Sequence, residues 1–169
     1  MASYRTILGI DPGLAHTGWG VVCQQGSKLS CVAYGCVETG PNSLLHDRLG
    51  TIYQQVSAVV RRYSPESVAI ETVWFGNNAK SAFATGQARG AALVACAGAG
   101  MGLAEYSPSQ IKLAVVGSGS ADKRQMQYMV QQLLGLEKPP SPDHAADALA
   151  AAICYTTHSF GVRERSVCP

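Results

Sequence analysis

Two acidic residues stand at the ends of apolar runs, where a carboxylate is unfavourable unless something offsets its charge. Asp11 ends "RTILGID", and Glu71 ends "SVAIE". In open α/β sheets, ligand sites tend to form at such strand ends. If the two strands are neighbours, charges ~4 Å apart repel each other by about 4 kcal/mol at an effective dielectric near 20. A bound cation or a proton on one acid would offset this repulsion, and oxygen ligands favour Mg²⁺ or Mn²⁺ over zinc.

A third segment, "SPDHAADALA", adds Asp143, His144 and Asp147. At about 3.6 residues per turn, Asp143 and His144 each share a helix face with Asp147. Four groups from three segments suit two divalent ions, which activate a water and stabilise the leaving oxygen in phosphodiester hydrolysis. Asp143 also has a structural interpretation, as a first-turn acid that complements the helix dipole. A histidine such as His144 is usually structural when it stands alone, but here it stands beside acids.

The charge distribution fits an enzyme that acts on a polyanion. The chain has 13 basic and 11 acidic residues, a net charge of +2. When the four acids of the candidate site are set aside, seven acidic residues remain against the 13 basic ones. Acids that lie together inside a basic surround suit a nuclease or another enzyme with a polyanionic substrate.

Cysteine spacing and hydropathy exclude several other classes. The six cysteines form no CxxC pair and follow no zinc-ligand spacing, so we expect reduced thiols that pack in the interior. No apolar run approaches the ~20 residues of a membrane span, and the first residues lack the pattern of a signal peptide. We therefore expect a cytoplasmic protein without a membrane partner.

Hydrophobic patterning predicts a mixed α/β sheet with helical cover. We expect strands at "RTILGID", "GWGVVCQ" and "KLSCVAYGCVE", the last two forming a hairpin, and later strands at "SVAIE" and "GLAEYS". Helices are expected over about 43–62, from residue 79, from Ser107-Pro108, and after the loop "VVGSGSADK". Another is expected in the last segment, with Ser141 as its N-cap and Pro142 as its first residue. Without repeats or low-complexity tracts, residues 1–169 should form one domain, with about 159–169 loosely attached.

Four segments, in this order, resemble the RuvC family of bacterial Holliday-junction resolvases, which belongs to the RNase H-like nuclease superfamily. They are "ILGIDPGLAHTGWGVV", "AIETVWFGNNAKSAFATGQARGAALVA", "SPSQIKLAVVGSGSADKRQM" and "PDHAADALAAAICY". The opening "GIDPG" also occurs in actin-like kinases and chaperones, but the ordered set is specific. The resemblance implies an RNase H-like fold, with a five-stranded mixed sheet flanked by helices.

The resemblance also implies an activity and a ligand set. A homodimer would cut two opposed strands of a four-way DNA junction, leaving 5′-phosphate nicks, in recombination and repair. The implied metal ligands are Asp11, Glu71, His144 and Asp147, holding two Mg²⁺ per subunit, with Mn²⁺ as a substitute. Many relatives have an aspartate where this chain has His144, which would act either as a neutral ligand or as a proton shuttle. Asp143 would either replace it as a ligand or remain a first-turn residue. The branch-migration proteins RuvA and RuvB are implied partners.

Basic and aromatic residues are candidates for holding DNA. Lys112 and Lys123 flank the "VVGSGS" loop, and Arg124 follows. Lysines at helix ends are often only solvated, whereas the resemblance favours phosphate contacts. Trp74 lies in a loop rich in glycine and asparagine; the resemblance implies that it stacks on an unpaired base, and the alternative is packing in the core. The small-residue segment "ATGQARGAALVACAGAG" fits a dimer interface or a close contact within the chain.

Three other functions compete with this interpretation. A YqgF-type nuclease shares the opening segment, but "GQARG" and "DHAADALA" favour the RuvC family. An actin-like ATP-binding module would need two such subdomains and a longer chain. A junction-binding protein without catalytic activity is expected to lack at least one of the acids, whereas each position carries a plausible ligand.

Overall fold

The computed structural model describes residues 4–73 and 78–158. The five strands are β1 (Tyr4–Asp11), β2 (His16–Gln25), β3 (Lys28–Glu38), β4 (Ser67–Glu71) and β5 (Gly102–Tyr106). The five helices are α1 (Leu45–Tyr63), α2 (Ala79–Ala97), α3 (Pro108–Val116), α4 (Lys123–Leu134) and α5 (Asp143–His158). The expected order of elements is confirmed, including the β2–β3 hairpin. Trp74 and residues 159–169, for which we made predictions, lie outside the described residues.

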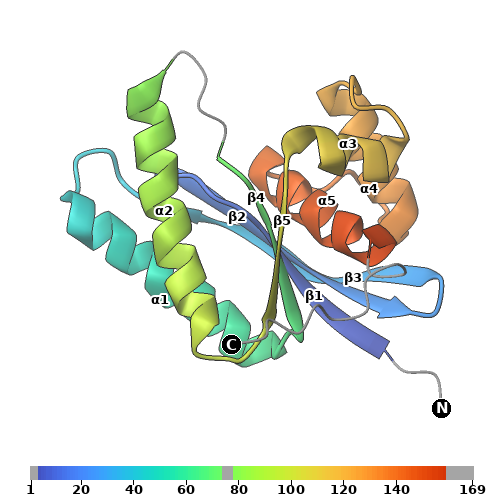
Figure 1. Ribbon diagram of the computed structural model, residues 1–169, viewed down its shortest axis with the longest axis horizontal. Helices are drawn as coiled ribbons and strands as arrows, with labels where there is room; N and C mark the ends of the chain where they lie inside the picture. Colours follow the sequence, from blue (N-terminus) through green and yellow to red (C-terminus); the bar gives the residue numbers. More distant parts are fainter. Residues whose placement is uncertain (1–3, 74–77, 159–169) are drawn as a thin grey trace, which may run out of the picture.

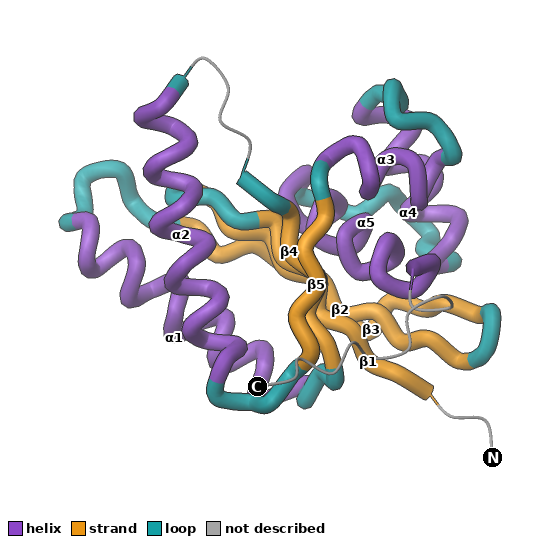
Figure 2. The backbone as a smooth tube through the Cα atoms, viewed as in Figure 1, coloured by secondary structure: helices purple, strands orange, loops and turns teal. Residues whose placement is uncertain are grey.

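The strands form one mixed sheet in the order β3-β2-β1-β4-β5. β1 runs antiparallel to β2 and parallel to β4, and β5 continues the parallel part of the sheet. Helices α1 and α2 lie on one face, and α3, α4 and α5 lie on the other (Figures 1 and 2). The expectation of a five-stranded mixed sheet flanked by helices is therefore confirmed.

Glycines on β1 and β2 let α5 lie directly on the sheet. A Cβ atom at Gly9 would stand 1.8 Å from the carbonyl oxygen of Ala148, and one at Gly18 would stand 1.8 Å from that of His144. These distances are far shorter than any van der Waals contact, so only glycine fits at either position. The start of α5 is consequently held close to the ends of β1 and β4.

Capping side chains set where α3 and α4 begin. Ser107 caps α3 and Asp122 caps α4, each through a reciprocal capping box. The prediction for α5 is wrong by one residue: the helix begins at Asp143, and the carbonyl of Pro142 accepts the N–H groups of Ala145 and Ala146 at 3.0 and 3.3 Å.

Within the described ranges, no helix combines the length and the apolar character needed to cross a membrane.

Candidate metal centre

The parallel pairing of β1 and β4 brings two of the predicted acids to the same edge of the sheet. Ile10 is aligned with Ile70, so the residues that follow, Asp11 and Glu71, end their strands at the same level. Side chains alternate along a strand, and Gly9 lies against α5. Asp11, two residues further, therefore lies on the side of the sheet that α5 covers.

The first turns of α5 add the other two predicted groups. His144 Nδ1 lies 2.8 Å from Asp11 Oδ2. One ligand atom each of Asp11, His144 and Asp147 can be chosen so that all lie within 4.8 Å of one another. The side chains of Asp11 and His144 remain 17% and 44% exposed, so an ion can reach them from solvent. Two carboxylates and an imidazole at this spacing can hold a divalent cation.

Glu71 lies outside this group of three but is coupled to it electrostatically. Burial raises the pKa of Glu71 to about 7, the negative charges of Asp11 and Asp147 add to the increase, and Lys112 opposes it. Burial, together with the charge of Asp11, raises the pKa of Asp147 to about 6, against Lys123 and His144. Burial also raises the pKa of Asp11, although His144 acts in the opposite direction. Burial, together with the repulsion expected from sequence, therefore favours protonated acids, and a bound cation would displace these protons.

Two hollows meet at Glu71. One, of about 350 Å³, is lined by Asp11, Glu71 and the residues that follow β4. The other, of about 240 Å³, is lined by Glu71, Asp147, Lys112 and Lys123 among others. The predicted acids and the two predicted lysines therefore share one concave region at the strand-end edge. A phosphate entering the second hollow would meet both cationic and metal-binding groups.

Asp143 points away from the acids and toward α4. Its Oδ2 lies 2.8 Å from Lys123 Nζ, and its Oδ1 accepts a hydrogen bond of 2.7 Å from Gln127 Nε2. The contact with Lys123 lowers the pKa of Asp143. Both carboxylate oxygens are thus engaged by α4, and His144, not Asp143, faces Asp11. Arg124, beside Lys123, is exposed at the start of α4.

The sequence interpretation missed His16, which contacts the site directly. Its ring stacks on that of His144, with ring centroids 5.3 Å apart and planes inclined by 6°. The signal was available, because His16 alternates with Gly18 and Gly20 in "HTGWG" and so lies on the face of β2 that meets α5. The importance of Gly9 and Gly18 for the approach of α5 was also missed.

Comparison with known proteins shows which family the chain resembles. A family model described as crossover junction endodeoxyribonuclease RuvC matches residues 7–155. A protein of that name from Heliobacterium modesticaldum is 50% identical, covering 88% of this chain and 91% of its own length. One from Desulforamulus reducens is 46% identical, covering 93% and 98%. The solved structure of Thermus thermophilus RuvC in complex with a Holliday junction substrate has a TM-score of 0.88 at 38% identity, covering 92% of this chain and 94% of that one. The yeast mitochondrial resolvase Ydc2, 13% identical with a TM-score of 0.63, shares the fold.

Proposed function

Because this chain belongs to the RuvC family of crossover junction endodeoxyribonucleases, we propose that it resolves four-way DNA junctions by metal-dependent phosphodiester hydrolysis. One observation carries the proposal: Asp11, His144 and Asp147 converge within 4.8 Å at the edge of the sheet where Glu71 also ends its strand. The solved complex of T. thermophilus RuvC with a junction supports the same substrate class for this chain.

The proposed metal ligands are Asp11, Glu71, His144 and Asp147, with Mg²⁺ as the ion and Mn²⁺ as a substitute. The group of three would hold one ion, and Glu71 with a neighbouring acid would hold a second. Bound ions supply positive charge that activates a water and stabilises the leaving oxygen. The chain itself orients the groups: Asp11 holds the Nδ1 edge of His144 toward the acids, and we propose that His144 acts as a ligand. Proton transfer by His144 is the alternative.

The basic residues beside the acids are proposed to hold the scissile strand. Lys112 and Lys123 line the hollow that contains Glu71 and Asp147, so a phosphate bound there would be neutralised by the two lysines. Lys123 is already oriented by its ion pair with Asp143. Contacts of this kind make junction affinity fall steeply as salt concentration rises. Stacking by Trp74 and a contact from Arg124 stay predictions.

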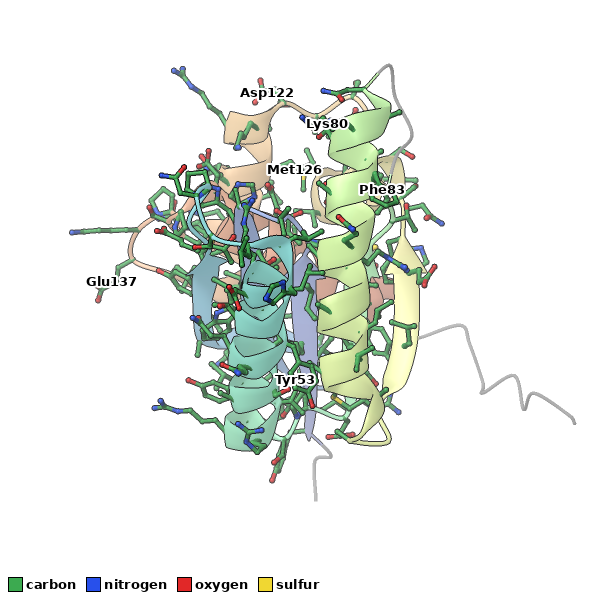
Figure 3. The ribbon with its side chains drawn as sticks, turned by 90° about the vertical axis from the view of Figure 1, so that its left-hand side faces the viewer. Tyr53, Lys80, Phe83, Asp122, Met126 and Glu137 are labelled. Atoms are coloured by element: carbon green, nitrogen blue, oxygen red, sulfur yellow. The ribbon has the colours of Figure 1, made fainter. Side chains whose placement is uncertain are left out.

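A second copy of the chain is proposed to pack against α2. One face of this helix carries Phe83, Gly86, Gly90 and Val94, with Phe83 68% and Val94 64% exposed. A Cβ atom added at either glycine would meet nothing within 4 Å, so a neighbouring helix could approach closely there. Figure 3 shows Phe83 projecting from α2 on the side away from α1. Arg89, by contrast, is engaged within the chain by Glu105 of β5.

The symmetry of such a dimer suits the substrate, because two equivalent strands of a junction must be cut together. Partnership with RuvA and RuvB rests on membership of the family.

The test is cleavage of a labelled synthetic four-way junction by the purified protein, with Mg²⁺, Mn²⁺ or a chelator. We expect paired symmetric nicks that ligase can seal, only when a metal is present, and intact linear duplex. Asp11→Asn should bind the junction but leave it uncut. A protein that binds the junction and cuts it with neither metal would be a junction-binding module, and cleavage of other nucleic acids instead would favour a YqgF-type nuclease.

A further inference from the structure

One face of β2 changes from glycine to histidine where α5 begins. His16, Gly18 and Gly20 alternate along the strand and so point to the same side. At Gly18 the backbone of α5 is so close that a Cβ atom would stand 1.8 Å from the carbonyl oxygen of His144. His16 lies two residues earlier on the strand and is exposed. Its side chain therefore has room, and it meets the ring of His144.

The contact between the two rings is flat. Their centroids are 5.3 Å apart and their planes differ by 6°. Asp11 holds the edge of the His144 ring through the 2.8 Å contact at Nδ1. An edge contact alone leaves the ring free to tilt, because the second side-chain torsion of histidine has a broad energy minimum. A parallel ring on the face opposes that tilt.

His16 is itself held by a well-anchored turn. The Thr17 hydroxyl donates a hydrogen bond of 2.7 Å to the carbonyl of Gly13, and the Thr39 hydroxyl donates to the carbonyl of Leu14. His16 is then aligned with Glu38 as the first pair of the β2–β3 ladder. These contacts fix the backbone of the turn and so place the ring of His16 beside that of His144.

We propose that His16 is a positioning residue, whose ring holds the His144 imidazole in the plane that presents its nitrogens to the metal site. The inference rests on the proposed role of His144 in that site. Among the described residues, the group whose ligand atoms lie close enough to hold one metal ion comprises Asp11, His144 and Asp147. His16 is not part of it, so His16 acts on the site through His144. Groups that orient a ligand from outside the coordination sphere commonly affect metal affinity.

The test compares His16→Ala with His16→Phe, because phenylalanine keeps a flat ring but can neither bind a metal nor carry a proton. His46→Ala, at an exposed histidine of α1, is the matched control. Mn²⁺ affinity is measured without DNA, from the electron paramagnetic resonance signal of the free ion. His16→Ala should weaken binding about three- to tenfold, the range of one stacked aromatic pair, and His16→Phe should restore it.

The stack has its own readout in the nuclear magnetic resonance spectrum of the four imidazoles. His16→Ala should move the ring signals of His144 by removing the ring-current effect of the stacked neighbour, while His46→Ala leaves them in place. His16→Gln, which also lacks a flat ring, replaces the alanine variant if that variant is poorly folded, as judged by circular dichroism.

Three results would overturn the proposal: unchanged Mn²⁺ affinity in His16→Ala, an unmoved His144 signal, or a His16→Phe variant as weak as His16→Ala. The last would show that imidazole chemistry matters and not flat contact. A wild-type protein that binds no Mn²⁺ would instead remove the proposed metal site itself. That failure is recognised from the wild type alone, before any His16 variant is compared.

Discussion

Replacing Glu71 by glutamine removes a charge that the fold disfavours while nearly keeping the shape of the side chain. Burial and the neighbouring acids raise the pKa of Glu71 from 4.5 to about 7. The folded protein thus binds the proton more tightly than the unfolded chain does. The stability that this tighter proton binding at Glu71 contributes is present in full below pH 4.5 and is lost as pH rises through 7.

The size of this effect follows from the same two values. Each unit of difference between the two pKa values corresponds to ~1.4 kcal/mol of unfolding free energy. Because Glu71 is partly solvated, we expect the ionised side chain to destabilise the fold by about 2–3 kcal/mol at pH 8. Glu71→Gln should therefore raise the unfolding free energy of the metal-free protein by that amount at pH 8, and by almost nothing at pH 4. A gain of this size would raise the melting temperature by roughly 5–10 °C.

Urea unfolding in the presence of a chelator, at both pH values, measures the difference. Glu66→Gln is the control, because Glu66 is exposed just before β4, at the other end of that strand from Glu71. Mg²⁺ should then stabilise the wild type more than Glu71→Gln, since a ligand that binds only the folded state raises its stability. A variant no more stable than the wild type at pH 8, or one with an equal gain at pH 4, would refute the reasoning.

Three further predictions test the site, its support and its substrate contacts. His144→Ala should lose most single-turnover cleavage while keeping junction binding. Asp143→Asn should retain cleavage, because α4 engages the carboxylate of Asp143. The reverse pattern would make Asp143 the ligand. Gly18→Ala should lower the unfolding free energy measured in urea by about 3 kcal/mol or more. Gly50→Ala should not lower it, because a Cβ atom at Gly50 would meet open space. Equal effects of the two changes would contradict the close contact between Gly18 and α5. Lys112→Ala should reduce the salt dependence of junction affinity by about one unit of slope, and an unchanged slope would exclude a phosphate contact.

The parts of the site predicted from sequence are those that local patterns determine. An apolar run that ends in an acid indicates both a strand and the position of its carboxylate, so the pattern alone places Asp11 and Glu71 at strand ends. Their common edge required only the assumption that the strands are neighbours, which the alignment of Ile10 with Ile70 confirms.

The remaining parts depend on contacts between distant segments. Asp143 and His144 are adjacent in the first turn of α5, and helical periodicity permits either one to act with Asp147. The distinction arises because Lys123 and Gln127 of α4 engage Asp143, leaving His144 against Asp11. No spacing within α5 could predict it.

The close approach of α5 explains both how the site is built and why it should bind a cation. Gly9 and Gly18 remove the side chains that would hold the helix away from the sheet, and the same closeness places Asp147 beside Asp11 in a partly buried space. Protons can offset the resulting charge, but a proton on a carboxylate blocks an oxygen that a metal would use. A divalent cation offsets the same charge and engages those oxygens at once. The arrangement that destabilises the ionised, metal-free protein is thus the one that favours metal binding, and two lysines line the same hollow as Glu71 and Asp147, where a phosphate would meet both charges.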